Sequence, residues 1–270
     1  MNGNPPTSDE AVPDGSSHVR LGYYVLSYVD ILGQGRELDK LEPLPDGEDG
    51  RQKALKILVE TAGFITQLRR IMKDVYTKQD AESSEIRIEG FSDTLVFYAK
   101  IDVANGVNAV ANIFAATASL VLAAMNAGHV LRGAIEIGIG TNLIPNEIYG
   151  PVLRRAYLLE SKCAQFPRIV IGETAEKFLR DCAASSSPVA RLCLDMIVTD
   201  RDSVRILDYL GGAAVNLGRQ PHKDLAADAE KFVKREFSKW KSSCDAKTAS
   251  KYSYLVEYFE SRRRFWAQKS

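Results

Sequence analysis

Two aspartates, Asp30 and Asp93, occupy places where folding alone gives little reason for a carboxylate. Asp30 ends the apolar run 23–29, and Asp93 follows Ser92 within a cluster of turn-forming residues. If the strands that carry them are neighbours in one sheet, the two carboxylates meet at one edge, where their repulsion favours a bound cation. Hard oxygen ligands of this kind suit Mg²⁺ or Mn²⁺ accompanied by the phosphates of a substrate. Taken singly, each aspartate can also be an ordinary turn residue.

The segment that follows Asp30 carries two glycines, in the order Ile31-Leu32-Gly33-Gln34-Gly35. A short glycine-bearing loop lets backbone N–H groups approach a phosphate closely. We therefore predict a phosphate-binding loop formed by the amides of Leu32, Gly33, Gln34 and Gly35.

The elements around these residues can be predicted from periodicity. Residues 23–33 are rich in β-branched and aromatic side chains and stop at glycine, which indicates a strand, and a polar loop follows over 34–50. Apolar residues then recur at three- and four-residue steps between Leu55 and Val75, which indicates a long amphipathic helix. Residues 85–98 form two alternating runs hinged at 90–93, which predicts a β-hairpin with Asp93 at its tip.

The remaining pattern alternates strands with helices. We expect helices over 103–128, 151–164, 174–184, 223–240 and 246–266, strands over 130–140 and 167–172, and a hairpin over 194–209. This order predicts an α/β sandwich with a mixed sheet flanked by helices and with extra C-terminal helices. It lacks the strict alternation of a doubly wound parallel fold.

Length and composition are consistent with one main core. The chain has 270 residues, of which 45% are apolar and 26% charged. Residues 1–19 are polar and rich in Pro and Gly, which predicts disorder. We expect a main domain over 20–215 and a C-terminal helical extension over 216–270 that packs on it.

The charge balance excludes some classes of partner. Thirty-five basic residues offset thirty-five acidic ones, so the strong positive field of a DNA-binding protein is missing. The longest apolar run, 109–125, contains Asn112, Thr117 and Ser119 and is interpreted as a buried helix rather than a membrane span. No export signal is visible, so we predict a cytoplasmic protein without DNA or membrane partners.

Four motifs resemble those of class III nucleotide cyclases, in the family's order. They are Tyr28-Val-Asp30-Ile-Leu-Gly33, Phe91-Ser-Asp93, Leu131-Arg132-Gly-Ala-Ile-Glu-Ile-Gly138 and the helix that begins at Tyr149-Gly150-Pro. The resemblance covers about residues 23–172 and implies a cyclase-like, ferredoxin-related sheet. It also implies two Mg²⁺ or Mn²⁺ ions per site, held by Asp30, the backbone carbonyl of Ile31 and Asp93. Arg132 would then reach the triphosphate and stabilise charge on the leaving group.

One departure from the family concerns the helix after Gly150. Purine cyclases carry Asn and Arg there, four residues apart, whereas this chain has Arg154 and Leu158. Arg154 or Arg155 is a candidate to replace the missing arginine, although arginines on helices are often merely solvated.

The stretches FSDTLVF, LRGAI and YGP are most similar to the pyrimidine cyclases of the Pycsar anti-phage system. This resemblance implies a homodimer that converts UTP, or CTP, to the cyclic monophosphate, which a separate effector protein senses. It places base-binding side chains at Glu89, Glu147 and Tyr149. By alternation alone Glu89 can also be a solvent-facing strand residue.

Three alternatives remain open. The chain can be a catalytically inactive cyclase-like sensor or interaction module, because the usual Asn/Arg pair is altered. It can be a purine cyclase that makes cyclic AMP or cyclic GMP. It can also be another two-metal phosphoryl-transfer enzyme, such as a diguanylate cyclase, although no GGDEF-like string occurs.

Overall fold

The computed structural model describes residues 21–33, 38–39, 41, 46–76, 86–102, 105–143, 147–243 and 245–267. The segment 1–19, predicted to be disordered, lies outside these residues. The predicted domain boundary at residue 216 falls inside one long helix, α7 (Gly212–Ser242).

The strands form one mixed sheet, as the element order predicted. They are β1 (Gly22–Leu32), β2 (Arg87–Phe91), β3 (Thr94–Ile101), β4 (Val130–Asn142), β5 (Ile148–Tyr149), β6 (Ile169–Ile171), β7 (Ile197–Thr199) and β8 (Arg205–Leu207). Their order is β2-β3-β1-β4-β6-β8-β7, with β5 paired to β4. The pair β4–β6 is parallel, and the other strand pairs in the described part of the chain are antiparallel.

The first half of the chain has the β-α-β-β-α-β order of a ferredoxin-like unit. It runs from β1 through α2 (Gly47–Tyr76), the β2–β3 hairpin and α3 (Gly106–Asn126) to β4. Strand β1 lies between β3 and β4 and is antiparallel to both, as in a split βαβ unit. The predicted ferredoxin-related core is therefore present, with β1 at its centre.

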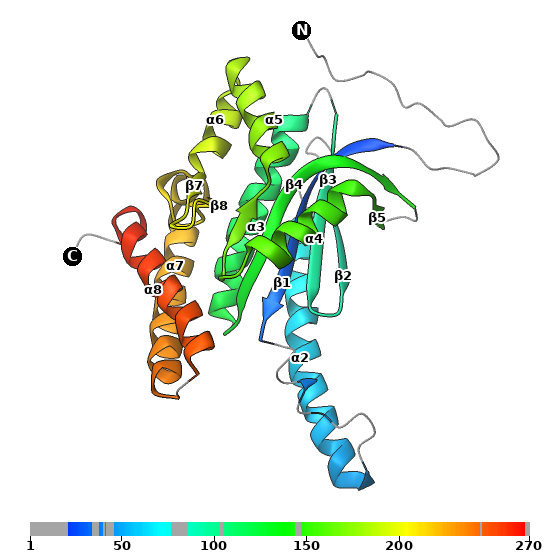
Figure 1. Ribbon diagram of the computed structural model, residues 1–270, viewed down its shortest axis with the longest axis vertical. Helices are drawn as coiled ribbons and strands as arrows, with labels where there is room; N and C mark the ends of the chain where they lie inside the picture. Colours follow the sequence, from blue (N-terminus) through cyan, green and yellow to red (C-terminus); the bar gives the residue numbers. More distant parts are fainter. Residues whose placement is uncertain are drawn as a thin grey trace, which may run out of the picture.

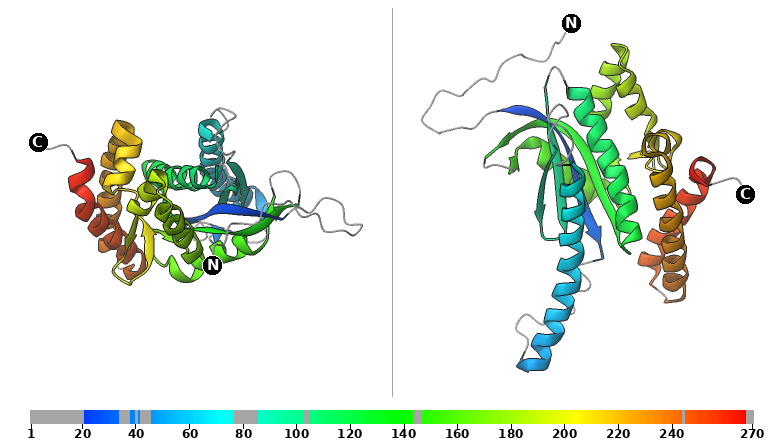
Figure 2. Two further views of the ribbon diagram at one scale, coloured as in Figure 1. Left: turned by 90° about the horizontal axis from the view of Figure 1, so that it is seen from above. Right: turned by 180° about the vertical axis from the view of Figure 1, so that it is seen from behind.

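The two faces of the sheet are covered differently. Helices α2 and α3 lie on one face, and α4 (Pro151–Cys163) lies on the other, as Figures 1 and 2 show. Side chains of β1 alternate between them: Val25 and Val29 join the large core under α3, whereas Tyr24 and Leu26 pack with Val152 of α4. Asp30 follows Tyr24 and Leu26 in this alternation, so it belongs to the α4 face.

Helix α3 contains the apolar run that the sequence places in the interior. In the described part of the chain it is the one helix long and apolar enough to cross a membrane. Thirteen of its 21 residues are buried, and Ile113 and Phe114 are fully enclosed in the core. It therefore packs as the central helix of the main core, as predicted.

Helices α7 and α8 (Ala246–Trp266) lie at the end of the sheet opposite β2 (Figure 1). Val233 of α7 and Phe259 of α8 are fully buried in the same core as α3. Helix α7 begins before the predicted residue 223 and runs through Pro221, with a kink at Arg219, where φ is 53°. A proline normally ends a helix, so the sequence pattern placed the start of α7 too late.

Three other boundaries differ from expectation. Helix α2 begins at Gly47, inside the predicted loop. Strand β5 was not predicted, because two residues are too few for a periodic signal. Helices α5 (Glu173–Ala184) and α6 (Pro188–Asp195) precede β7, and α6 takes up the first residues of the predicted hairpin.

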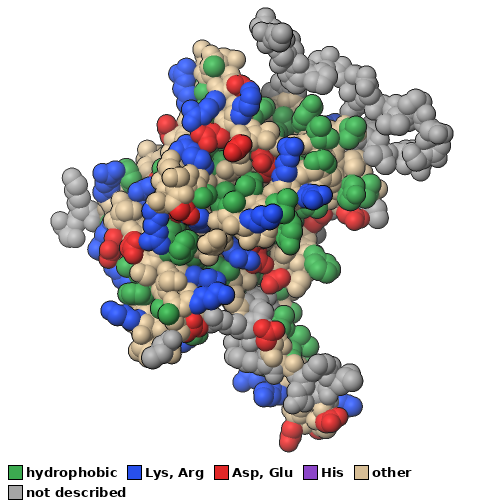
Figure 3. Space-filling model, in the orientation of Figure 1, with side chains coloured by type: hydrophobic (Ala, Val, Ile, Leu, Met, Phe, Trp, Pro, Cys, Tyr) green, Lys and Arg blue, Asp and Glu red, His purple; other side chains and the backbone are tan. Residues whose placement is uncertain are grey.

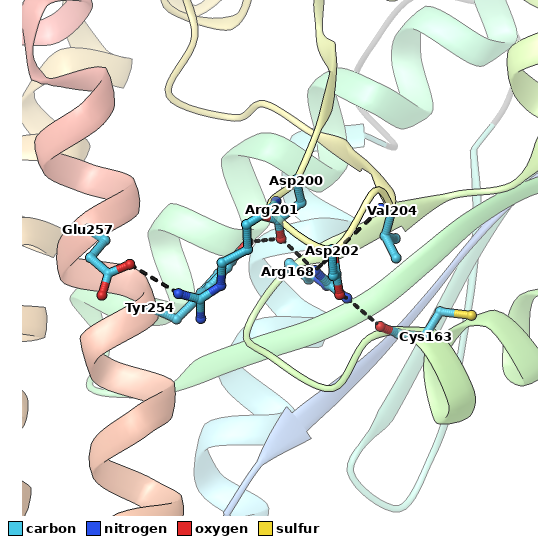
Figure 4. A network of polar contacts seen from close by, with 8 residues as sticks. All are labelled: Cys163, Arg168, Asp200, Arg201, Asp202, Val204, Tyr254 and Glu257. Carbon is cyan, nitrogen blue, oxygen red and sulfur yellow. Dashed lines mark hydrogen bonds and ion pairs between the residues drawn. The ribbon is translucent and has the colours of Figure 1, made fainter.

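A buried arginine joins α8 to the sheet (Figure 4). Arg168 is 2% exposed and donates to Asp200, at 2.5 Å, to both oxygens of Asp202, at 2.6 and 2.8 Å, and to the carbonyl of Cys163, at 2.7 Å. The hydroxyl of Tyr254 in α8 donates to the same Asp200 carboxylate at 2.8 Å. This network fixes the end of α4, the β7–β8 hairpin and α8 relative to one another.

Candidate active site

The two predicted carboxylates lie at the same end of neighbouring strands. Residue Asp30 of β1 pairs with Thr94 of β3, and Asp93 lies in the two-residue turn between β2 and β3. The backbone N–H of Ile31 donates to the carbonyl of Asp93 at 3.3 Å. Strand β1 continues to Leu32, in agreement with the predicted stop at Gly33, so Asp30 lies two residues before the end of the strand.

The carboxylates of Asp30 and Asp93 influence each other electrostatically. Burial raises the pKa of Asp30, and the negative charge of Asp93 raises this pKa further. Arg132 acts in the opposite direction, as does Lys251 of α8, whose charge also lowers the pKa of Asp30. The site is thus a pair of acids that benefits from a nearby cation, and the C-terminal extension contributes to its field.

Arg132 of β4 lies between two acids. Its Nε donates to Asp30 Oδ2 at 3.2 Å and lies 2.5 Å from Oε1 of Glu160 in α4. The pair with Asp30 has hydrogen-bond geometry, whereas Glu160 Oε1 is buried without a hydrogen-bond partner. Arg132 therefore directs its N–H to Asp30 and has Glu160 as a second, unaligned neighbour.

Glu160 was not predicted from the sequence. It is 3% exposed and follows Val152 and Ala156 at four-residue steps on the face of α4 that packs against the sheet. Burial raises its pKa, Arg132 lowers it, and Asp30 and Asp93 raise it again, to about 7. An acid at an otherwise apolar, sheet-facing helix position was the signal in the sequence that could have revealed it.

Two tyrosines and a threonine complete the surroundings of Asp30. The hydroxyls of Tyr28 and Thr94 lie 3.4 Å apart, and the rings of Tyr28 and Tyr157 meet edge to face with centroids 5.8 Å apart. Tyr157 belongs to α4 and is 49% exposed. The rings of Tyr28 and Tyr157 border the acids on one side and leave that side partly exposed to solvent.

The predicted phosphate-binding loop is described only in part. Leu32 pairs with Val130 within the sheet, and Gly33 is exposed with a φ of 94°. Gln34 and Gly35 lie outside the described residues. In an antiparallel pair the N–H and C=O of one residue face the same neighbour, so the carbonyl of Ile31 faces the turn that carries Asp93.

The predicted base-binding residues lie around β2 and β5. Glu89 Oε1 accepts a hydrogen bond from the backbone N–H of Ile148 at 2.5 Å. The hydroxyl of Tyr98 also bonds to Glu89 and donates to Asn142 at 3.1 Å. Glu89 is therefore not a solvent-facing strand residue with a free carboxylate. Burial is the main reason that its pKa is raised.

The other two predicted base-binding residues are open to solvent. Glu147 is exposed, and its charge contributes to the raised pKa of Glu89. Tyr149 is 62% exposed. Tyr98 and Asn142, which sequence reasoning missed, join Glu89 in one polar cluster beside them.

Helix α4 begins at a position that requires glycine. Gly150 has a φ of 130°, and an added Cβ would lie 3.1 Å from the Cα of Gly140. Arg154 follows on an exposed side of the helix, about 60° from Tyr157 by helix geometry. Arg155 is turned about 200° from Tyr157, and its charge acts on Glu136 instead. By helix geometry Arg154 therefore lies on the same flank of α4 as Tyr157, and Arg155 lies on the opposite one.

The donor set fits a hard divalent cation that shares its coordination with a substrate. Within the described residues no three His, Cys, Asp or Glu side chains form a metal-binding group. Asp30 and Asp93 supply carboxylate oxygens, the carbonyl of Ile31 faces them, and Arg132 already places a positive charge on Asp30. Magnesium typically takes one or two carboxylates and completes its shell with water and phosphate oxygens.

Comparisons with known proteins give structural similarities alone. No protein-family model matches the sequence, and no curated protein matches it. The chain is similar to the crystal structure of the adenylyl cyclase CyaB from P. aeruginosa, with 14% identity, a TM-score of 0.43 and coverage of 61% of this chain and 83% of that one.

Two other solved structures are similar at the same level. The catalytic core of a rhodopsin-guanylyl cyclase with converted specificity, in complex with ATPαS, has 9% identity and a TM-score of 0.42, covering 70% of this chain and 95% of that one. A bacterial light-regulated adenylyl cyclase has 10% identity and a TM-score of 0.41, covering 77% and 98%. Similarities this low do not assign an activity to the chain.

Proposed function

We propose that the protein is a nucleotide cyclase that converts a pyrimidine nucleoside triphosphate to its 3′,5′-cyclic monophosphate and pyrophosphate. The observation that carries this proposal is that Asp30 pairs with Arg132 and lies on the strand next to the β2–β3 turn that holds Asp93. Two acids and one cation at the end of a β-hairpin suit a metal-bound triphosphate. The four sequence motifs that resemble class III cyclases supply these same residues.

Each of these groups has a distinct task in the proposed reaction. Asp30, Asp93 and the carbonyl of Ile31 would hold two Mg²⁺ or Mn²⁺ ions, and the amides of Leu32 to Gly35 would bind phosphate oxygens. Such cations would supply a lower pKa of the ribose 3′-hydroxyl and compensation of charge on the leaving pyrophosphate. By fixing the cations, the carboxylates would position the triphosphate for in-line attack by the 3′-oxygen on the α-phosphorus.

The arginines stabilise the charge that develops. Arg132 leaves Asp30 and donates to the leaving pyrophosphate, since its guanidinium is next to the proposed metal site. Arg154, on the exposed flank of α4, replaces the arginine that purine cyclases carry on this helix. Both roles require that the guanidinium groups reach phosphate oxygens rather than neighbouring acids.

A pyrimidine is the proposed base because the stretches FSDTLVF, LRGAI and YGP are similar to the pyrimidine cyclases, and large neighbours of Glu89 support this choice. Glu89 accepts from the N–H of Ile148 through Oε1 and also bonds to Tyr98, and its carboxylate would accept from uracil N3–H or a cytosine amino group. Tyr149 lies on the adjoining strand β5, where its large ring would leave less room for a purine. UTP is the preferred candidate, with CTP second.

The exposed apolar side chains around the site support a homodimer. Phe91 at the hairpin is 84% exposed, Tyr149 62% and Tyr157 49%. Figure 3 shows apolar side chains gathered over α4 and β5. A twofold partner covering this face would bury them and would bring its own Arg154 to the triphosphate. The product would serve as a second messenger in the cytoplasm for a separate effector protein in anti-phage defence.

The direct test is product analysis. Purified protein is incubated with each of ATP, GTP, CTP and UTP in the presence of Mn²⁺, and the products are identified by mass spectrometry. Cyclic UMP, or cyclic CMP, is the expected product. Mainly cyclic AMP or cyclic GMP would refute the pyrimidine assignment, and no cyclic product from any triphosphate would refute the cyclase proposal.

A further inference from the structure

The geometry points to Glu160 as a positioning residue for Arg132. When a divalent cation displaces the Arg132 guanidinium from Asp30, Glu160 accepts that guanidinium. This inference rests on the proposed metal site at Asp30 and Asp93. It assigns to a buried acid of α4 a role that neither the motifs nor their spacing assign.

Glu160 has a buried carboxylate oxygen to which no hydrogen bond is donated in the described part of the chain. Glu160 Oε1 is buried, has no hydrogen-bond partner, and lies 2.5 Å from Arg132 Nε without hydrogen-bond alignment. A buried carboxylate oxygen without a donor is costly, so Glu160 gains from any movement that turns the guanidinium toward it. Within the described part of the chain, the hydrogen bond from Arg132 Nε goes to Asp30 instead.

Negative side chains in this cluster outnumber the positive charges that pair with them. Among the ion pairs of the described residues, Arg132 is the cation paired with both Asp30 and Glu160, the charge of Lys251 acts on Asp30 from α8, and Asp93 adds a third negative charge that acts on both acids. A divalent cation between Asp30 and Asp93 would repel Arg132 and release it from Asp30. Glu160 then retains the guanidinium beside the site, where it faces the phosphates rather than solvent.

Helix α4, which carries Glu160, is held rigidly by packing and by hydrogen bonds at its end. The carbonyl of Cys163, three residues further along α4, accepts from the buried Arg168 at 2.7 Å, and Ala164 N donates to the carbonyl of Glu160 at 3.2 Å. Val152 and Ala156, on the same face, are fully buried. Glu160 is therefore held in place while the longer side chain of Arg132 moves.

The test measures Mn²⁺ binding to the full chain by electron paramagnetic resonance, without nucleotide. Glu160→Gln is made in the wild-type and in the Arg132→Met backgrounds. In the wild-type background, Arg132 loses its alternative charged partner, and we expect Mn²⁺ to bind about tenfold more weakly. In the Arg132→Met background, the same substitution should have little further effect, because the competing guanidinium is gone.

Controls separate this mechanism from others. Glu230→Gln changes a buried acid that pairs with Lys234 on α7, and should leave Mn²⁺ binding unchanged. If Glu160→Gln does not fold, Glu160→Asp keeps the charge but withdraws it from Arg132, and should weaken binding in the same way.

Three results would overturn the inference. Equal weakening in both backgrounds would mean that Glu160 acts on the metal directly, no weakening would mean that Arg132 needs no second partner, and an absence of Mn²⁺ binding by the wild type would remove its basis. The cyclase proposal fails separately, if Mn²⁺ binds as expected but no triphosphate is cyclised.

Discussion

At the scale of single residues, the site contains three acids, and Arg132 forms ion pairs with two of them. Burial raises the pKa values of Asp30 and Glu160, the charge of Asp93 raises both further, and Arg132 lowers both. A protein would not retain such an arrangement for stability alone, since a buried acid without full compensation costs free energy. The arrangement is understandable if a divalent cation is the missing partner.

The metal role predicts that neither aspartate can be replaced. Asp30→Ala and Asp93→Ala should each lower cyclase activity by more than about tenfold, because loss of a metal ligand removes several kcal/mol of transition-state stabilisation. Turnover is measured by pyrophosphate release, and folding by circular dichroism. Asp181→Ala, at an exposed acid of α5 that pairs with Lys177, is the matched control and should retain full activity. A folded Asp30→Ala variant that keeps more than about a tenth of wild-type turnover would contradict the assignment.

The raised pKa of Glu160 predicts a dependence of stability on pH. Its carboxyl titrates near 4.5 when exposed and at about 7 in the fold, so the folded protein binds more protons within this window. Stability should therefore fall as pH rises from 4.5 to 7, by on the order of 3 kcal/mol from this residue. Urea unfolding in the presence of EDTA measures this loss, and Glu160→Gln should flatten it. An unchanged pH profile in the variant would show that other groups cause the dependence.

At the scale of elements, the placement of α4 depends on contacts at both of its ends. Gly150 allows the backbone to approach β4 at the start, and Arg168 binds the carbonyl of Cys163 at the end. Arg168 also binds Asp200 and Asp202 of the β7–β8 hairpin. A helix anchored at both ends presents Glu160 and Tyr157 to the acids in a defined orientation.

Removal of the buried arginine should destabilise the fold strongly. Arg168→Met removes the buried guanidinium that donates to Asp200, Asp202 and the carbonyl of Cys163, and we expect a loss of about 3–5 kcal/mol in the free energy of unfolding. Arg201→Met is the matched control, because Arg201 is 50% exposed and pairs with Glu257, itself 61% exposed. That variant should lose about 1 kcal/mol or less. Both values come from urea unfolding, and equal losses would mean that burial of the pair is unimportant.

At the scale of the whole molecule, the α4 face is the half-covered side of the sheet. Helices α2 and α3 cover the other face, whereas α4 is the described helix that lies over this one (Figure 1). Phe91 of β2 and Tyr149 of β5 are exposed. One chain therefore supplies the acids without enclosing the substrate. A second copy related by a twofold axis would complete two equivalent sites.

The dimer predicts complementation between two inactive variants. When an Asp30→Ala chain is mixed with an Arg154→Ala chain, heterodimers contain one site with both substitutions and one intact site, so activity should recover to about a quarter of wild type. Mixing Asp30→Ala with Asp93→Ala is the control, since both residues come from the same half of a site, and it should restore nothing. Full activity of a monomer, verified by sedimentation at the assay concentration, would contradict the shared site.

Local patterns determined the framework of this protein. The apolar run ending at Asp30, the turn residues at Asp93 and the three- and four-residue spacing of α2 and α3 predicted a mixed sheet with Asp30 on one strand and Asp93 in the turn of a hairpin, and the fold agrees. Such features are readable because strand and helix periods depend on nearby residues. The roles in metal, phosphate and base binding stay predictions from the resemblance.

Only the tertiary structure decided which side chains meet those acids. Glu160 reaches Arg132 because the register of α4 on β4 brings together residues 28 positions apart in the sequence. Glu89 binds Ile148 because the two-residue strand β5 folds back beside it, and Arg155 turns away because of its angle around α4. Arg168 and Tyr254 of α8 likewise come from distant segments and bind the same Asp200 carboxylate. These pairings depend on packing between elements that are distant in the sequence, and a local sequence pattern does not specify that packing.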